Sequence, residues 1–255
     1  MKIKHIIFGF AALLSFLCSF YSAVCLLLFL SSSKEDKNSN KNSTAHLEHD
    51  LLEAVYSLIK DYALLALFII QHSCMASSTY KKFIERINLG VIERSIYNFA
   101  TSLCILLLIN QWKYVNTYKL WDLPTESYPI INSGIFIFHL ISWSVIYGGS
   151  LLMDTPEIFG IKQVIYDVKG LSCPIAYKSR ELRRLYQHMR HPSFIALFVI
   201  FWCTPVMSLD RLLLASMWSL YMLLGWRTDS FDVDYQKDQL DRKRHELHRL
   251  LQENN

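Results

Sequence analysis

Long apolar runs alternate with polar segments along the chain. The hydrocarbon core of a bilayer is about 30 Å thick, and a helix needs about 20 apolar residues to cross it. Apolar runs near this length predict six spans, at residues 6–30, 58–76, 96–112, 131–153, 192–207 and 209–226. The polar segments predict loops at 31–57 and 154–191 and a charged tail at 227–255. We therefore expect one all-α, polytopic membrane domain.

The last two predicted spans are short and close together. Residues 192–207 would form a helix of about 24 Å at 1.5 Å per residue, which is less than a bilayer core. The connection Pro205-Val206-Met207-Ser208 is tight, so the two spans should form an antiparallel hairpin. Just before them, residues 180–189 carry apolar side chains at i, i+3, i+4 and i+7 and basic ones between. This pattern predicts an amphipathic helix in the headgroup region.

The distribution of basic residues predicts the orientation. An even number of spans places both termini on one side of the membrane. Of the 26 lysines and arginines, 19 fall in the N-terminus, the loops at 77–95 and 154–191, and the tail. Basic residues favour the cytoplasmic side, so these segments should face the cytoplasm or nucleoplasm. The loop at 31–57 is then lumenal, and its Asn42-Ser43-Thr44 sequon makes Asn42 a candidate glycosylation site.

Composition excludes several other classes. The chain is 52% hydrophobic, and its eight glycines and six prolines are too few for a low-complexity or collagen-like protein. Five of the six cysteines lie in apolar runs and no CxxC pair occurs, so neither a disulfide framework nor a metal site is expected.

The clearest candidate for chemistry is Arg190-His191-Pro192, where a basic segment meets an apolar run. Arg190 could bind a carboxylate or phosphate with two hydrogen bonds, and His191 could act as a donor or base. In the alternative interpretation, Arg190 reaches toward lipid phosphates and Pro192 starts a helix.

Two histidines fall inside predicted spans. An ionisable group within the membrane is a candidate functional residue, so His72 and His139 are both candidates. His72 should share a leaflet with Arg190 and His191, whereas His139 lies nearer the middle of its span. The alternative is a neutral histidine that forms hydrogen bonds between helices.

One segment carries a resemblance to a known enzyme family. The run Arg190-His191-Pro192-Ser193-Phe194-Ile195-Ala196, a hairpin and then several aspartates resemble the isoprenylcysteine carboxyl methyltransferase superfamily. Those membrane enzymes carry Arg-His-Pro-x-Tyr-x-Gly, a hairpin and a glutamate pair, and use S-adenosylmethionine. The resemblance implies cofactor contacts by His188, Arg190, His191 and Asp232. Phe194 and Ala196 depart from the pattern and the glutamate pair is missing, so no catalytic residue is assigned.

A second resemblance covers most of the chain beyond the first loop. It rests on Gln71-His72-Ser73, His139 with Ser142-Trp143, the segment 160–166, Arg190-His191-Pro192 and the segment 210–215. Their order and spacing resemble the nurim family, multi-pass proteins of the inner nuclear membrane related to those methyltransferases. The resemblance implies six spans and residence in the nuclear envelope, with the endoplasmic reticulum as second choice. It implies no activity.

Three functional hypotheses follow. The first is a structural or scaffolding protein of the inner nuclear membrane, without a cofactor. The second is a methyltransferase that uses S-adenosylmethionine on a lipid or prenylated substrate. The third is a tether that binds lamina or chromatin proteins through basic segments such as Arg242-Lys243-Arg244. The bilayer is a partner in each of them, and sequence-specific binding of nucleic acid is not expected.

Overall fold

The structure is a computed structural model. It describes residues 3–31, 45–115, 117–125, 127–179 and 193–225, and in the tail residues 234, 237, 238, 240–245 and 249. The interfacial helix predicted at 180–189 lies outside these residues.

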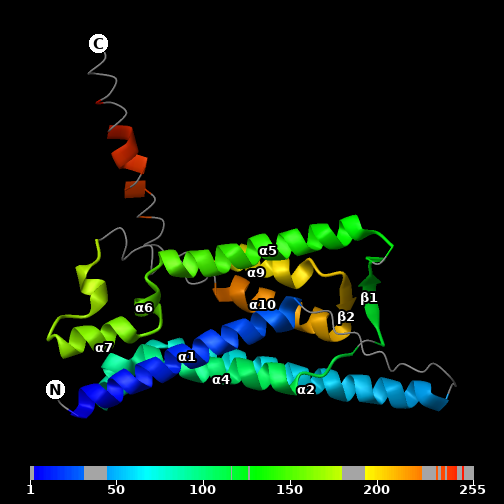
Figure 1. Cartoon of the computed structure of the whole chain (residues 1–255), viewed down its shortest axis with the longest axis horizontal. Coiled ribbons are helices and arrows are strands. Elements are labelled where there is room, and N and C mark those ends of the chain that lie inside the picture. Colours follow the sequence, from blue (N-terminus) through cyan, green and yellow to red (C-terminus); the bar gives the residue numbers. More distant parts are fainter. Residues whose placement is uncertain are drawn as a thin grey trace.

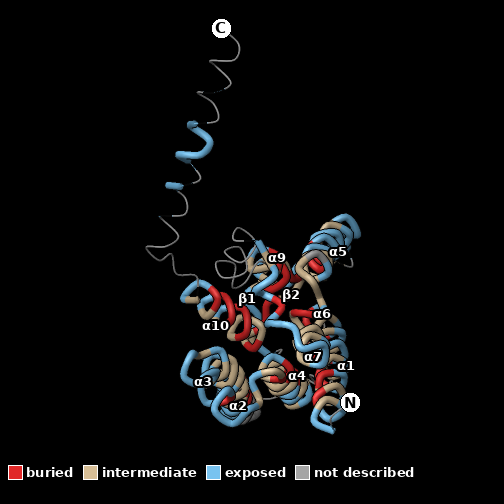
Figure 2. The backbone as a smooth tube through the Cα atoms, turned by 90° about the vertical axis from the view of Figure 1, so that its left-hand side faces the viewer, coloured by how far each residue is buried: buried red, intermediate tan, exposed pale blue. Residues whose placement is uncertain are grey.

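Long helices form the body of the protein (Figure 1). They are α1 (Ile3–Ser31), α2 (Ala45–Ala76), α4 (Glu93–Gln111), α5 (Pro129–Leu152), α9 (Phe194–Trp202) and α10 (Leu209–Gly225). Viewed end-on, they form a ring in the order α1, α4, α2, α10, α9 and α5 (Figure 2). The Tyr147 hydroxyl of α5 donates to the Ala23 carbonyl of α1 at 3.1 Å and so joins the two ends of this order.

The chain is an all-α, polytopic membrane protein. Three of the described helices are long and apolar enough to cross a bilayer: Ile3–Ser31, Gly90–Gln111 and Pro129–Leu151. Large apolar side chains on their outer faces are exposed in the isolated protein, including Phe20 of α1 and Phe136 of α5. An apolar surface on helices of this length is typical of contact with lipid tails.

Of the helices in the other three predicted spans, α10 (Leu209–Gly225) matches the span predicted at 209–226, whereas α2 and α9 depart from the predicted bounds. Helix α2 begins at Ala45, inside the segment predicted to be a loop. The helical spacing of Leu51, Leu52 and Val55 is consistent with this start, but the mean hydropathy of residues 45–57 is too low to predict a membrane span there. Helix α9 has nine residues, Phe194–Trp202, and α10 has 17. At 1.5 Å per residue, the described parts of these two helices measure about 14 Å and about 26 Å, so the hairpin is short, as predicted.

A two-stranded sheet was not predicted from the sequence. Strand β1 (Lys119–Asp122) pairs antiparallel with β2 (Val206–Ser208), with Trp121 opposite Met207. The α4–α5 connection thereby pairs with the turn between α9 and α10. Both strands are too short to show an alternating pattern in the sequence. We call this end of the bundle the sheet end (Figure 1).

Short helices occupy the opposite end, which we call the cap end. They are α3 (Ser78–Arg86), η1 (Gly90–Ile92), α6 (Thr155–Ile158), α7 (Ile161–Val168) and η2 (Pro174–Tyr177). Phe8 and Ala12 of α1 form a small core there with Ile92 and Val164. Within the segment predicted to be a polar loop, α7 packs onto the start of α1, and the turn before it bonds to the first turns of α4.

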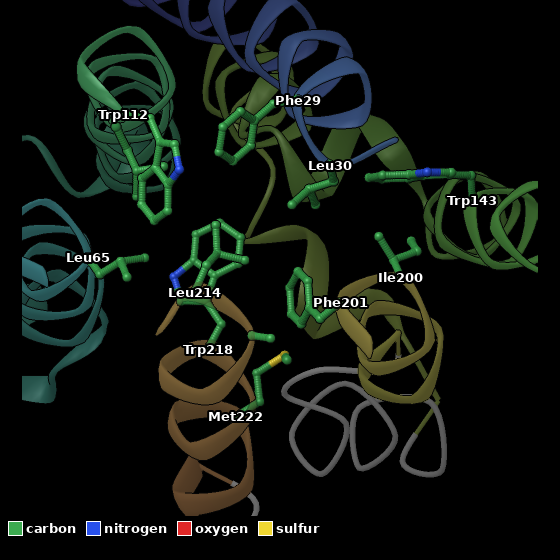
Figure 3. Close-up of a cluster of buried hydrophobic side chains, with 12 residues drawn as sticks. Phe29, Leu30, Leu65, Trp112, Trp143, Ile200, Phe201, Leu214, Trp218 and Met222 are labelled. Atoms are coloured by element: carbon green, nitrogen blue, oxygen red, sulfur yellow. The ribbon is translucent and has the colours of Figure 1, made fainter. Parts of the chain in front are cut away.

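The main core lies inside the ring of helices, where side chains from all six meet (Figure 3). Aromatic residues dominate it: Trp218 of α10 lies 5.5 Å from Phe201 of α9 and 5.3 Å from Phe68 of α2, between ring centroids. Phe29 of α1 meets Trp112, the residue directly after α4, edge-on at 5.6 Å. Since every long helix contributes to this cluster, it fixes how the helices pack.

Candidate functional site

The predicted cofactor residues and the candidate glycosylation site lie outside the described residues. They are His188, Arg190, His191, Asp232 and Asn42. The two candidate histidines within predicted spans, His72 and His139, are described.

His72 lies in a cluster of aromatic rings from three helices at the cap end. The Tyr97 hydroxyl of α4 is 2.8 Å from its Nε2 and 2.9 Å from its Nδ1. The ring stacks on Phe68 at 5.5 Å and meets Tyr221 of α10 edge-on at 6.1 Å. The Tyr221 hydroxyl lies 3.0 Å from Ser73 Oγ. Hydrogen bonds and ring contacts at His72 thus join α2, α4 and α10.

His139 connects different helices, nearer the sheet end. Its Nε2 lies 2.7 Å from the Cys203 carbonyl oxygen, and its Nδ1 lies 3.5 Å from Ser31 Oγ. A carbonyl only accepts, so Nε2 carries a proton. The Trp143 indole donates to the same Ser31 Oγ at 3.0 Å. His139 therefore links α5 to the ends of α1 and α9, as expected of a histidine that bonds between helices.

Two buried aspartates at the sheet end were not identified as candidate site residues from the sequence. Asp210, in the first turn of α10, is fully buried and accepts from the Trp112 indole N–H at 3.0 Å and the Val115 amide at 3.1 Å. The Ser208 hydroxyl donates to it at 2.6 Å. A buried carboxylate needs such donors, since desolvation without them is costly.

The second aspartate binds the same stretch of backbone from another helix. Asp61 of α2 is fully buried, and its Oδ1 accepts from the Lys113 amide at 3.0 Å. Its Oδ2 has no hydrogen-bond partner among the described residues. The segment that follows α4 is therefore held at Lys113 by α2 and at Val115 by α10.

A small cavity lies beside these groups. Arg211 is half-buried there and donates to the Leu30 carbonyl at the end of α1, at 3.1 Å. The cavity measures about 20 Å³ and is lined by Phe29, Leu30, Trp112, Tyr114, Ile200, Phe201, Asp210, Arg211 and Leu214. This volume is sufficient for about one water molecule. Burial raises the pKa of the Tyr114 hydroxyl, so that phenol stays neutral.

An ion-pair network of opposite charges lies at the cap end. Lys178 Nζ is 2.9 Å from Glu157 Oε2 and 3.7 Å from Asp154 Oδ2. Lys162 pairs with Asp154 and lies 4.0 Å from Glu157 Oε2. The hydrogen bond from Lys162 lowers the pKa of Asp154, and the same bond raises the pKa of Lys162. These charges hold the cap in one arrangement.

The loop between α6 and α7 lies directly against α4. The Asn98 amide donates to the Ile158 carbonyl at 2.8 Å. Gly160 has a φ of +84°, and a Cβ at this position would lie against Ser95, 2.9 Å from its backbone nitrogen. Only glycine combines this backbone conformation with this contact.

The sequence is similar to curated proteins along most of its length. It is 42% identical to the Nurim homolog of Drosophila melanogaster over 239 residues, covering 93% of this chain and 94% of that protein. It is 36% identical to Nurim of Bos taurus over 252 residues, covering 94% of each chain.

The chain belongs to the nurim family. Identity to the Homo sapiens Nurim is 38% over 194 residues, covering 74% of this chain and 72% of that protein. No protein-family model and no solved structure matches the chain.

Within this nurim-family sequence, one signal does point to Asp61 and Asp210. Each is a carboxylate inside or directly before an apolar helix, where an ionisable group needs a partner. Asp210 also lies in the segment 210–215 that carried the family resemblance. The sequence did not reveal the partners because two donors to Asp210, Trp112 and Val115, lie 98 and 95 positions earlier in the chain.

Proposed function

We propose that this nurim-family chain is a structural, multi-pass protein of the inner nuclear membrane. The observation that carries the proposal is the fully buried Asp210 carboxylate, which accepts hydrogen bonds from Trp112, Val115 and Ser208. Its charge fixes the end of α4, strand β2 and the start of α10 in one arrangement. A membrane frame with such internal bonds is suited to a structural role.

Two further contacts support the same role. His139 bonds to Cys203 and Arg211 to the end of α1, so these polar groups also connect helices. The nuclear location rests on the family resemblance, from which residence in the nuclear envelope was expected.

The location is tested by imaging a fluorescently tagged full-length chain in animal cells. We expect the tag to concentrate at the nuclear rim relative to the peripheral endoplasmic reticulum. Asp210→Ala should reduce the enrichment of the tag at the nuclear rim, because the substitution removes the carboxylate that accepts hydrogen bonds from Trp112, Val115 and Ser208. Ser144→Ala, at an exposed hydroxyl of α5, is the control. An even spread of the wild-type protein through the endoplasmic reticulum and plasma membrane would contradict the location.

The structural role has its own test in purified protein. The competing hypothesis predicts that S-adenosylmethionine binds and that Arg190→Ala abolishes the binding. We expect no binding that depends on Arg190 when the wild type and this variant are titrated in detergent by calorimetry. Binding that disappears in the variant would overturn the structural role, whatever the location.

A tethering function is the second candidate, favoured by exposed basic residues in the tail. Arg242, Lys243 and Arg244 lie in the described helical residues 240–245, and all three are exposed. Such a cluster fits an acidic surface on a protein partner. Reversing the three charges should speed fluorescence recovery after photobleaching, whereas Arg242→Lys with Arg244→Lys should leave it unchanged. Equal recovery in all three proteins would refute the tether.

A further inference from the structure

Residues 80–87, in helix α3 and directly after it, form four pairs of side chains, and each pair lies on a different face of the helix. Residues four apart on a helix share a face, and neighbouring residues differ by about 100°. The four pairs are Tyr80 with Ile84, Lys81 with Glu85, Lys82 with Arg86, and Phe83 with Ile87. The last of these eight, Ile87, follows the helix with near-helical backbone angles of −90° and 14°.

The burial of each pair gives it a role. Ile84 is 5% exposed and faces the protein, whereas Phe83 and Ile87 are 55% and 45% exposed. The exposed apolar pair lies between the buried pair and Lys82 with Arg86. The pair of Lys81 with Glu85 lies on the side opposite the apolar pair, because it is about 160° away at 100° per residue.

The position of α3 places it at a membrane surface. Only residues 87–89 separate it from Gly90–Gln111, one of the segments long and apolar enough to cross a bilayer. Three residues reach at most about 10 Å, so α3 cannot leave the membrane surface. Figure 2 shows α3 beside α2.

The orientation of α3 is also fixed. The Ser77 hydroxyl caps its start by accepting from the Tyr80 amide at 3.2 Å. At its other end, the Leu89 amide bonds to the Ile84 carbonyl at 3.1 Å, and Asn88 has a φ of 61°. With both ends capped and Ile84 buried, the helix cannot easily roll to hide Phe83 and Ile87.

We propose that α3 is a binding site for anionic phospholipid. Phe83 and Ile87 enter the edge of the acyl region, and Lys82 and Arg86 then lie at the depth of the headgroup phosphates and carboxylates. Lys81 and Glu85 remain in water. A helix with an apolar face flanked by basic side chains binds anionic bilayers in this way. The charge of Lys82 and Arg86 selects a negatively charged lipid over a zwitterionic one.

The test is a lipid titration of the purified full-length chain. Phosphatidylserine or phosphatidylcholine is added to the detergent-solubilised protein, and native mass spectrometry measures the apparent Kd of each bound lipid. The wild type should bind phosphatidylserine more tightly. Lys82→Gln should raise the Kd for phosphatidylserine about fivefold, because each basic residue near an anionic surface contributes about 1 kcal/mol. The double variant Lys82→Gln with Arg86→Gln should raise it further. Lys81→Gln is the matched control and should leave the Kd unchanged.

Two further variants separate a lipid site from a site for free anions or for a protein. Lys82→Arg keeps the charge and should restore the wild-type Kd. The double variant Phe83→Ser with Ile87→Ser removes no charge but should still weaken phosphatidylserine binding. A site for free anions would not lose affinity in this variant, because it does not need apolar contacts with acyl chains. Amide exchange over residues 78–89, measured in the same samples, should match the wild type. Equal effects of Lys81→Gln and Lys82→Gln, or equal binding of the two lipids by the wild type, would overturn the proposal.

Discussion

The indole N–H of Trp112 donates to the carboxylate of Asp210 across 3.0 Å, and both side chains are buried. The two residues are 98 positions apart, so this bond connects the end of α4 to the first turn of α10. Val115, three residues further on, donates its amide to the same carboxylate. Asp61 of α2 accepts from the Lys113 amide between them. Two helices thus hold one short backbone segment through two buried carboxyl groups.

Replacing Trp112 with Phe should destabilise the protein measurably. The substitution retains the ring packing against Phe29 but removes a donor to a buried carboxylate. Hydrogen bonds to charged groups contribute about 1.5–3 kcal/mol, so the apparent free energy of unfolding should fall by about this amount. Chemical unfolding in detergent, followed by near-ultraviolet circular dichroism, measures it.

Trp121 offers a matched control for that measurement. Its indole donates to the neutral carbonyl of Thr204 at 3.0 Å. Trp121→Phe should therefore cost only about 0.5–1.5 kcal/mol. If Trp121→Phe were as damaging as Trp112→Phe, the special contribution of the buried charge would be refuted.

The sequence predicted the helices well where they are apolar and long. The observed α1, Ile3–Ser31, and α5, Pro129–Leu152, begin and end close to the predicted spans at 6–30 and 131–153. Hydropathy alone determines such segments, because the bilayer requires a continuous apolar helix. The beginning of α2 was missed because residues 45–57 mix acidic and apolar side chains.

The contacts that complete the sheet end could not be read from the sequence in the same way. Strand β2 has three residues and takes its partner from the connection before α5. The pairing of Asp61 and Asp210 with backbone amides depends on how α2, α4 and α10 pack, which involves distant parts of the chain. A pattern along a single sequence does not determine which distant amide a carboxylate will meet.

Gly160→Ala should destabilise the cap end. The backbone φ of +84° is unfavourable for alanine, and the added methyl would press on Ser95 of α4. Strain of about 1–2 kcal/mol is expected from the backbone alone, with about 1–3 kcal/mol more from the overpacked contact. Amide exchange of residues 155–168 should accelerate accordingly.

Gly170→Ala separates the two contributions. Gly170 also has a positive φ, +66°, but a Cβ at this position would have no neighbouring atom within 4 Å, so only the backbone strain remains. It should cost about 1–2 kcal/mol. Equal acceleration of exchange by the two variants would contradict a tight contact between Gly160 and Ser95.

The ion pair of Asp154 with Lys162 should make the cap sensitive to pH at both extremes. The Asp154 pKa is lowered in the folded protein, so its contribution is present above the ordinary value of about 3.9 and is lost as the pH falls through the folded value. The Lys162 pKa is raised, so its contribution is present below about 10.4 and is lost as the pH rises through the folded value. Stability of the cap should therefore be greatest between these limits.

Lys162→Met tests this dependence directly. We compare protection factors of residues 155–168 in the wild type and the variant at each pH, so that the intrinsic pH dependence of exchange cancels. The wild type should be better protected near neutral pH, and its advantage should shrink as the solution is acidified below the ordinary aspartate pKa of about 3.9. An advantage that stays constant into acid would show that the pair does not stabilise the cap.

Buried serines form the seam between α1 and α4, and this seam should not tolerate a larger side chain. Ser102 Oγ donates to Ser19 Oγ at 3.0 Å, and Ser15 Oγ donates to the Ser95 carbonyl at 2.7 Å. Small polar residues allow helices in a membrane to approach closely and bond to each other. Ser19→Leu would remove the bond and force α1 and α4 apart, at a cost of about 1–3 kcal/mol in stability.

Ser144→Leu is the comparison that makes the result specific. Ser144 is exposed on α5 and bonds only within its own helix, to the Leu140 carbonyl at 2.7 Å, in the hydrogen bonds described for it. Leucine there adds apolar surface toward lipid, so the thermal stability of the purified protein should not fall. Because the two variants add the same side chain to two long apolar helices, only the position of the serine differs between them. A loss of stability that is equal in both would mean that hydroxyl removal, and not packing between α1 and α4, controls the effect.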